Sequence, residues 1–370
     1  MIKPRLLIAL PGLHAVARGA ETAFEQLGVG LSEEGFDVTL MGTGPARPGQ
    51  AYGWLQGRMV PRERFRNWPS IPPLRSEYRW EELTFVPSLW QAFDPSRFDL
   101  TMTCSYPFVN WVLRAKRKAG RPLHVFVTEN GDWPAYAGNR EYRWFGCDGL
   151  VCTNPVYQQR NQARWRCALV PNGVELERFT PGPAERAAFG LPDGVPLVCM
   201  VSALIPSKFP LEGVRAVAAL PGAHLLLAGD GPLREECDRL GQELLGPRYR
   251  RVTVPSDRMP AVYRCADVFL HLSRDEAFGN IYIEAAACGL PVVAHDTPST
   301  RWILKHSGRL LDTADADALV RELTTALEKP LDVALIQATR EDLRARFSWP
   351  VICRQYADFL HALLDDRESA

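Results

Sequence analysis

The chain has 370 residues, of which 46% are hydrophobic and 23% charged, and its 43 basic residues balance its 43 acidic residues. This length is typical of about two domains, and the composition is that of a folded protein with hydrophobic cores. A formal charge of zero argues against a general nucleic-acid binder. No apolar stretch approaches the roughly 20 residues that are needed to span a membrane.

The first apolar run follows Lys3 and Arg5, a combination that signal peptides also show. Pro11 and Gly12 end the run after a length typical of a buried strand, so we expect a strand here. The nine cysteines include no Cys-x-x-Cys pair, and several lie in apolar runs, which indicates free buried thiols in a reducing compartment. We therefore expect a cytoplasmic protein.

Short apolar runs alternate with helical patterns in the first part of the chain. We expect strands at residues 5–10, 36–41, 100–104, 124–128 and 148–152, and helices at residues 21–34 and 111–119. Strand–helix–strand order implies a parallel sheet. Residues 45–95 break this rhythm with many prolines and aromatic residues, as an irregular insertion would.

A second alternating series follows a stretch rich in proline and glycine, residues 180–196, which we expect to be an interdomain linker. Its strands are expected at residues 197–201, 224–228, 268–272 and 291–294, and its helices at residues 211–220 and 281–288. We therefore predict two α/β domains, at residues 1–180 and 181–347. A helical tail at residues 348–370 is expected to pack back on the first domain. In such sheets, ligands bind at the carboxyl ends of the strands.

The most informative segment runs from Glu276 to Glu284, two glutamates eight positions apart. We expect Glu276 in a loop after a strand and Glu284 one turn into a helix. Gly279 permits close backbone approach, and the first amides of the helix form a site for an anion such as a diphosphate. Glu276 is then placed to accept hydrogen bonds from sugar hydroxyls, and Glu284 from ribose hydroxyls. Two unrelated surface carboxylates are the alternative.

This segment resembles the glutamate–seven–glutamate motif of the family 4 glycosyltransferases, and residues 170–175, 227–232 and 285–294 extend the resemblance. The resemblance implies the GT-B fold, with two Rossmann-like parallel-sheet domains facing a central cleft. It also implies a retaining enzyme that moves a sugar from a nucleotide-diphosphate-sugar donor to a saccharide, lipid-linked or small-molecule acceptor. The acceptor would bind to the first domain and the donor to the second.

The resemblance also implies roles for particular residues. Lys208 matches the lysine that contacts the donor diphosphate, and Gly19 matches a glycine of a loop that approaches this diphosphate from the first domain. Glu284 matches the ribose-binding glutamate. The other residues of the implied donor site are Ser202, Glu276, Phe278, Gly279, Asn280 and Ile281. Lys208 and the helix amides would stabilise the leaving diphosphate, whose own oxygen can take the acceptor's proton.

The sequence departs from the family pattern near the diphosphate. Ala203 occupies a position where the family usually has an arginine, so one cation is missing, and Arg301 is a weak candidate to replace it. The glycine pair of the first domain reads Gly19-Ala20, whose methyl group narrows the loop. Ala203 keeps open the alternative of a catalytically weakened nucleotide-sugar-binding protein on the same fold.

Many relatives also have a histidine after the strand that here ends at Thr128. The nearby His124 lies inside the strand and is expected to be structural. A polar role therefore falls to Glu129, Asn130 or Asp132, unless a carboxylate here only caps the next segment. We take Glu129 and Asn130, together with Lys208 and Glu276 of the second domain, as the candidate catalytic residues.

No cofactor or metal is expected, because no cluster of His, Cys and Asp has metal-ligand spacing. A nucleotide-binding dehydrogenase is a rival interpretation. It requires Gly-x-Gly-x-x-Gly after the first strand, whereas this loop reads Pro11-Gly12-Leu13-His14-Ala15. The loop therefore argues against the dehydrogenase.

The segment from Trp54 to Trp80 holds six arginines and two glutamates, a net charge of about four positive units, among aromatic residues. The charged residues are Arg58, Arg62, Arg64, Arg66, Arg75 and Arg79 against Glu63 and Glu77. Arginines beside aromatic rings suit anionic lipid head groups or a sugar acceptor. We predict that the segment shapes acceptor access and gives weak peripheral contact with the inner face of a membrane. A solvated insertion is the alternative.

Overall fold

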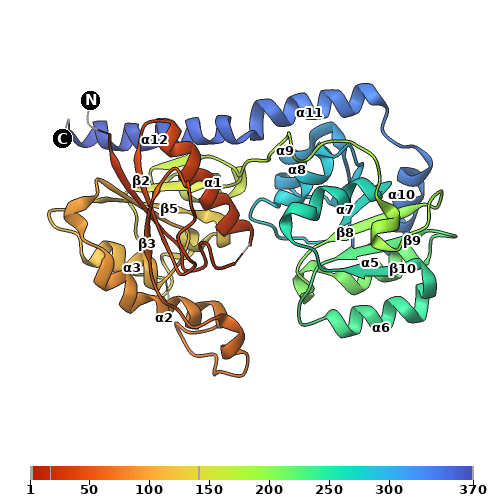
Figure 1. The fold of residues 1–370 in the computed structure, drawn as a ribbon, viewed down its shortest axis with the longest axis horizontal. Coiled ribbons are helices and arrows are strands. Elements are labelled where there is room, and N and C mark those ends of the chain that lie inside the picture. Colours follow the sequence, from red (N-terminus) through yellow and green to blue (C-terminus); the bar gives the residue numbers. More distant parts are fainter. Residues whose placement is uncertain (1–2, 17, 141, 369–370) are drawn as a thin grey trace. The chain divides into compact units, whose positions relative to one another are not determined.

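The computed structural model describes residues 3–16, 18–140 and 142–368, and the chain divides into two compact units (Figure 1). The first unit comprises Met1–Gly173 and Trp349–Ala370, and the second comprises Val174–Ser348. The chain therefore leaves the first unit, builds the second, and returns to the first with its last helix.

The first unit is built on a sheet of seven strands in the order β3-β2-β1-β4-β5-β6-β7, and every neighbouring pair is parallel. The strands are β1 (Arg5–Ala9), β2 (Asp37–Gly42), β3 (Gly53–Gln56), β4 (Leu100–Thr103), β5 (Leu123–Val127), β6 (Gly149–Cys152) and β7 (Cys167–Leu169). Strands β4, β5 and β6 are buried along their whole length. Burial on both faces explains why they read as continuous apolar runs rather than as alternating patterns.

Five α-helices accompany this sheet in residues 3–16, 18–140, 142–173 and 349–368. They are α1 (Gly19–Glu33), α2 (Glu77–Ala92), α3 (Phe108–Ala115), α4 (Pro155–Asn161) and α12 (Trp349–Glu368). Helix α12 packs beside α1, and its Ile352, Tyr356 and Leu360 are buried in the same cluster as Phe24 of α1 (Figure 1). The last helix thus supplies part of the core of the first unit.

The division between the units falls between Gly173 and Val174 rather than at residue 180, and residues 180–196 are not a linker. Val174 and Phe189 are both buried in the core of the second unit. Arg186 donates hydrogen bonds to backbone carbonyls of this unit. The linker prediction was wrong because the prolines and glycines here shape a packed segment of the second unit.

Residues 45–95 are not an irregular insertion, since they contain β3 and the whole of helix α2. This helix buries charged side chains, namely those of Arg79, Glu81 and Glu82, and it holds Pro87 in its interior. Buried charges and an internal proline remove the apolar periodicity by which a helix is recognised in a sequence.

The second unit is built on a six-stranded sheet in the order β10-β9-β8-β11-β12-β13, again parallel throughout. The strands are β8 (Leu197–Val201), β9 (His224–Ala228), β10 (Tyr249–Val252), β11 (Val268–His271), β12 (Val292–His295) and β13 (Gly308–Leu311). The helices are α5 (Pro210–Ala218), α6 (Arg234–Leu245), α7 (Met259–Cys265), α8 (Asn280–Ala287), α9 (Pro298–Leu304), α10 (Ala316–Glu328) and α11 (Val333–Phe347). Two parallel-sheet domains confirm the predicted fold class.

In each sheet the first strands of the chain extend the sheet in one direction, and the later strands extend it in the opposite direction from the first strand. This switch point lies between β1 and β4 in the first unit and between β8 and β11 in the second. Open parallel sheets bind ligands outside the carboxyl ends of the strands at such a point. The loops after these four strands are therefore the places where a site is expected.

Candidate functional site

The loops after β8 and β11 meet at Glu276, which lies between β11 and α8. The ammonium of Lys208, from the turn after β8, forms an ion pair with Oε1 of Glu276. Nε2 of His271, at the end of β11, donates to the same oxygen at 2.8 Å. Burial alone would raise the pKa of Glu276, but the hydrogen bond from His271 and the charge of Lys208 lower it to about 2. Glu276 is therefore ionised at neutral pH.

His271 was missed at the sequence level. Its ring is buried, with a side chain only 1% exposed, and burial lowers its pKa. The ring is then neutral at pH 7, and its Nε2–H orients the carboxylate of Glu276. A histidine at the carboxyl end of a strand, five residues before Glu276, was the available signal.

Helix α8 begins at Asn280, four residues after Glu276, so that Glu276 lies in the loop and Glu284 in the helix as the motif predicted. Gly279 precedes its first residue, Asn280, with a φ of 83°, a conformation that favours glycine. A Cβ at Gly279 would lie 2.6 Å from the ring of Tyr282, so the close packing also requires glycine. The first turn of the helix lies at the positive end of its dipole, where backbone amides favour a negative charge. This end of α8 suits an anion.

Two buried hydroxyl groups in this part of the second unit have no hydrogen-bond partner among the residues that the structure describes. One is Oγ of Ser202, just after β8, and the other is the hydroxyl of Tyr282 on α8. The ring of Tyr282 packs edge-on against His271, with centroids 5.3 Å apart. Because buried polar atoms are nearly always bonded, these two hydroxyls are exceptions that a hydrogen bond to a polar ligand or to water would satisfy.

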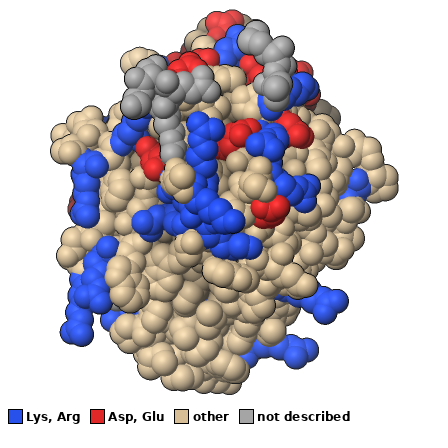
Figure 2. Space-filling model, turned by 90° about the vertical axis from the view of Figure 1, so that its left-hand side faces the viewer, with Lys and Arg blue, Asp and Glu red and all other residues tan. Residues whose placement is uncertain are grey.

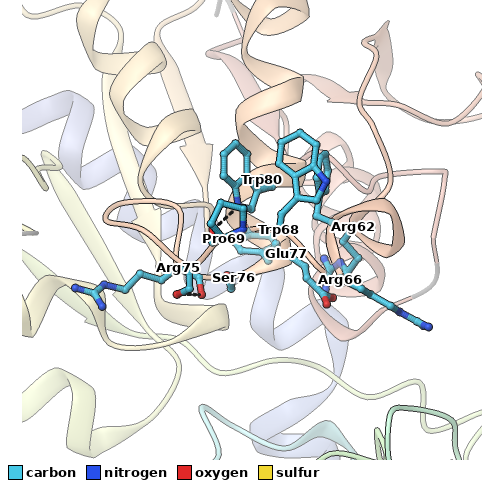
Figure 3. Close-up of a pocket in the computed structure, with 11 residues that line it drawn as sticks. Arg62, Arg66, Trp68, Pro69, Arg75, Ser76, Glu77 and Trp80 are labelled. Atoms are coloured by element: carbon cyan, nitrogen blue, oxygen red, sulfur yellow. Dashed lines mark hydrogen bonds between the residues drawn. The ribbon is translucent and has the colours of Figure 1, made fainter.

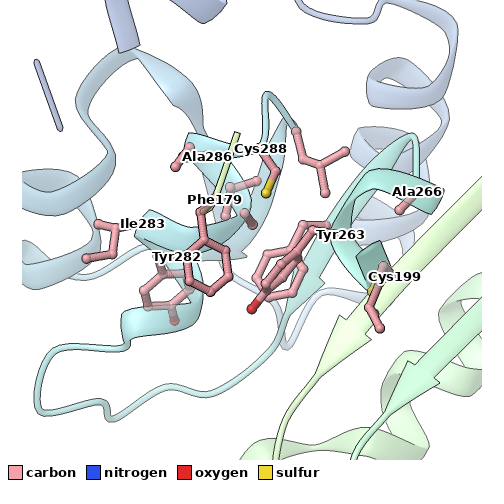
Figure 4. Close-up of a cluster of buried hydrophobic side chains, with 14 of the residues drawn as sticks. Phe179, Cys199, Tyr263, Ala266, Tyr282, Ile283, Ala286 and Cys288 are labelled. Atoms are coloured by element: carbon pink, nitrogen blue, oxygen red, sulfur yellow. The ribbon is translucent and has the colours of Figure 1, made fainter. Parts of the chain in front are cut away.

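Glu284 lies one turn into α8, where Tyr263 of α7 donates a hydrogen bond to its Oε2 at 2.8 Å. Burial raises the pKa of Glu284, and the bond from Tyr263 opposes this rise. Figure 4 shows Tyr263 and Tyr282 within the buried cluster that also holds Ile283 of the helix. This packing fixes α8, and with it the carboxylate.

The side chain of Phe278 does not face this site. It is 2% exposed and packs against Trp302 and Phe347, with ring centroids 6.2 and 5.4 Å away. Phe278 therefore anchors the loop in the core, and only its backbone is available to a ligand. The structure thus brings Lys208, Glu276 and the start of α8 together at the switch point of the second sheet, whereas Ser202, just after β8, bonds through its amide to Ala228 of β9.

The remaining predicted residues belong to the first unit. Glu129 and Asn130 form a short turn after β5. Nδ2 of Asn172, beyond β7, donates to both carboxylate oxygens of Glu129 at 2.8 Å, and Nδ2 of Asn130 approaches Sγ of Cys104 at 3.3 Å. Gly19 is the exposed first residue of α1. The polar groups after β4, β5 and β7 therefore meet at the carboxyl edge of this sheet.

Two neighbours of these residues, His124 and Asp132, bond to other parts of the first unit. Both ring nitrogens of the buried His124 have partners, Thr101 at 2.9 Å and Asn110 at 3.0 Å, which confirms the structural role expected of it. Asp132 is 6% exposed and accepts a hydrogen bond of 2.6 Å from Asn161. This oxygen, Oδ1, ties the turn to α4, whereas Oδ2 has no hydrogen-bond partner among the described residues, so a polar role of Asp132 stays a prediction.

A cavity of about 490 Å³ opens in the first unit between the start of α2 and the segment before it (Figure 3). Its lining is formed by Arg62, Phe65, Arg66, Trp68, Pro69, Ser70, Arg75, Ser76, Glu77, Tyr78 and Trp80. The rings of Trp68 and Trp80 meet edge to face, 4.7 Å apart, and Trp68 is 52% exposed. The hydroxyl of Tyr78 lies 2.6 Å from Oγ of Ser105, after β4. The cavity wall is thus tied to the switch-point loop of the first sheet.

Some observations bear on a metal or a membrane. No group of three His, Cys, Asp or Glu side chains in the described part of the chain could hold a metal ion. Metal independence stays a prediction. Among residues 3–16, 18–140 and 142–368, no helix combines the length and the hydropathy needed to cross a bilayer.

Comparison with known proteins agrees with the fold. The model of the family "Glycosyltransferase Family 4" matches residues 17–178, and that of "Glycosyl transferases group 1" matches residues 183–344. The structure of sucrose-phosphate synthase from Thermosynechococcus elongatus is similar, with a TM-score of 0.81, 24% identity and coverage of 99% of this chain and 100% of that one. HepE of Anabaena, in complex with UDP and glucose, has a TM-score of 0.76 at 17% identity, over 97% of this chain and 100% of that one.

Curated relatives are also glycosyltransferases. The D-inositol 3-phosphate glycosyltransferase of Mycolicibacterium smegmatis is 36% identical over 55% of this chain and 50% of its own length. The chain thus matches about half the length of this relative. The lipopolysaccharide core biosynthesis glycosyltransferase LpsE of Rhizobium meliloti is 26% identical over 92% of this chain and 95% of its own.

The two parallel-sheet domains and the similar solved structures define a protein of the GT-B class. Because the two family models together cover most of the chain, it belongs to the GT-B glycosyltransferases of the group 1 type.

Proposed function

We propose that this chain transfers a sugar, with retention of anomeric configuration, from a nucleotide-diphosphate-sugar donor to a saccharide, lipid-linked or small-molecule acceptor. The observation that carries the proposal is the arrangement of Lys208, Glu276 and His271 beside the first turn of α8. It combines a carboxylate for sugar hydroxyls with a cation and helix amides for phosphate oxygens. The similarity to HepE, whose structure contains UDP and glucose, supports the same donor class.

In this proposal the second unit stabilises the leaving group. Charge develops on the diphosphate as the bond from the sugar's anomeric carbon to oxygen breaks, and the amides at the start of α8 are oriented toward that charge in advance. The acceptor hydroxyl forms the new bond, and its proton passes to an oxygen of the leaving phosphate. Glu284 holds the ribose hydroxyls, while Glu276 holds the sugar. No added metal is required.

The first unit would hold the acceptor. The cavity at the start of α2 is lined by aromatic rings and serine hydroxyls, which are groups that bind sugars, and Tyr78 joins it to the loop after β4. Relatives named for inositol phosphate and for lipopolysaccharide core make saccharide and lipid-linked acceptors the first to test. Glu129 and Asn130 are the polar groups that we propose beside the acceptor hydroxyl.

We also propose weak contact of the segment from Trp54 to Trp80 with an anionic membrane. Fewer of its arginines are available for this contact than the sequence count indicated. Arg62 is paired with Glu81, and Arg79 is buried with a 2.7 Å bond to the carbonyl of Pro73, so neither is available to a lipid. Arg64 and Arg66 are exposed. Figure 2, viewed toward the first unit, shows Lys and Arg side chains gathered across one face with fewer acidic side chains among them.

Calorimetric titration with UDP, GDP, ADP and dTDP tests the donor site. Glu284→Gln should weaken binding of the preferred diphosphate by about tenfold to a hundredfold, because hydrogen bonds to a charged group contribute about 1.5–3 kcal/mol. Tyr263→Phe is the matched control, since it removes the bond to Glu284 but keeps the carboxylate. Equal affinity of wild type and Glu284→Gln would contradict this role of Glu284.

Transfer assays then separate an enzyme from a protein that only binds the nucleotide sugar. Wild-type protein that binds a nucleotide diphosphate should release it from the matching nucleotide sugar when acceptors are present. Binding without turnover over a broad acceptor panel would favour the catalytically weakened alternative that Ala203 keeps open.

A further inference from the structure

The loop between β11 and α8 carries a cation that the motif does not include. Arg274 lies two residues before Glu276 and is exposed. Its guanidinium carbon lies 4.6 Å from the ring centroid of Phe209, the residue next to Lys208. The loops after β8 and β11 are therefore connected twice, by Lys208 with Glu276 and by Phe209 with Arg274.

Arg274 has no competing partner in the part of the chain that the structure describes. Among the described residues its guanidinium forms no hydrogen bond or ion pair, and the aromatic ring is its contact. Phe209 itself has a φ of 52°, a conformation uncommon for a residue with a side chain, and it immediately precedes helix α5. The ring is thus held beside Lys208 by the backbone of this turn, and it keeps the guanidinium close to the same place.

The other charged groups near this site supply too little positive charge for a diphosphate. Lys208 is already paired with Glu276, so the pair carries no net charge, and a diphosphate needs a further cation besides Lys208. Ala203 has no charge to offer. Arg301 is engaged by Asp296, with Nε and a terminal nitrogen each 2.5 Å from a carboxylate oxygen, so the earlier suggestion of Arg301 is withdrawn.

We propose that Arg274 is the second cationic contact of the donor diphosphate, supplied from the loop after β11 instead of the loop after β8. The inference rests on the proposed function and names a further residue of the same site. An arginine suits the role because its planar group can stack on Phe209 with one face while its edge donates two parallel hydrogen bonds to phosphate oxygens. The ammonium group of a lysine at this position would stack less well on Phe209 and could not donate two parallel hydrogen bonds in this way.

The test compares dissociation constants by calorimetry, using whichever of UDP, GDP, ADP and dTDP binds wild type most tightly. Arg274→Ala should raise the dissociation constant of the diphosphate at least tenfold and leave that of the free nucleoside within twofold. Arg274→Lys should fall between wild type and Arg274→Ala. Arg301→Ala is the matched control, an exposed arginine of the same unit, and it should bind like wild type.

A second variant makes the test independent of any loss of folding. In the Arg274→Ala background, Ala203→Arg should restore at least part of the diphosphate affinity, because it returns a cation to the loop after β8. Unchanged diphosphate affinity in Arg274→Ala, with the expected loss in Glu284→Gln, would overturn the role of Arg274 and keep the donor site. Wild type that binds none of the four diphosphates would overturn the proposed function and this inference with it.

Discussion

Helix α2 contains a carboxyl group whose protonation should govern the stability of the first unit. Glu82 has no exposed surface. Its Oε1 accepts a hydrogen bond of 2.8 Å from the amide of Val109, whereas Oε2 has no partner in the described part of the chain. Burial raises the pKa of Glu82 from 4.5 to about 8, against the lowering effect of the Val109 bond and of Arg79.

The sign and size of the effect follow from this difference in pKa. Below pH 4.5, Glu82 is protonated in the folded and unfolded states alike. Between pH 4.5 and about 8 the folded state alone keeps the proton, so the free energy of unfolding falls by about 1.4 kcal/mol for each pH unit. At pH 7 the loss amounts to about 3 kcal/mol, a large part of the 5–15 kcal/mol typical of a protein. The loss is complete above pH 8.

Urea denaturation at pH 5, 6, 7 and 8 checks this reasoning. Glu82→Gln keeps the shape of the side chain and the acceptor for Val109, so it should be more stable than wild type at pH 8, with a difference that shrinks toward pH 5. Glu81→Gln is the matched control. Glu81 bonds to Arg18 and Arg62, and although its burial acts to raise its pKa, these arginines lower it overall. Its replacement should therefore destabilise at neutral pH. Parallel pH profiles for wild type and Glu82→Gln would refute the assignment of a neutral, buried carboxyl.

The other predictions concern the site and its surroundings. Transfer should survive excess EDTA, since Lys208, Arg274 and helix amides can balance the diphosphate; complete loss that magnesium or manganese restores would show that a metal belongs to the reaction. Gly279→Ala should weaken diphosphate binding at least tenfold, because the new Cβ meets the ring of Tyr282; unchanged affinity would mean that the start of α8 does not contact the phosphates. Replacement of Arg64 and Arg66 by glutamate should reduce binding to anionic vesicles at low salt about tenfold or more and leave nucleotide affinity unchanged. If the wild-type protein does not bind such vesicles, the proposed membrane contact is wrong.

The predictable part of the fold was the part buried on both faces. Strands such as β5 and β8 read as continuous apolar runs because helices cover both sides of a parallel sheet. Helix α2 was not predictable, since Glu81 and Glu82 lie on its buried side and find their partners in other elements. A pattern of apolar residues cannot reveal a helix that packs with its charges inward.

The candidate site also has a part that the sequence predicted and a part that it did not. Local spacing placed Glu276, Gly279 and Glu284 correctly on a loop and a helix, because these positions depend only on neighbours in the chain. The pairing of Lys208 with Glu276 joins residues 68 positions apart, and the stacking of Arg274 on Phe209 joins the same two loops. Such contacts depend on the adjacency of β8 and β11 in the sheet, which no local pattern states.

The return of α12 to the first unit sets an order of events during synthesis. The ribosome releases residues of the first sheet early, but the buried Ile352, Tyr356 and Leu360 that complete its core are among the last to emerge. The second unit, whose residues are continuous from Val174 to Ser348, can close its own core before that moment. The half of the chain that is made first is therefore the half that finishes folding last, and until α12 arrives the apolar side of α1 stays exposed.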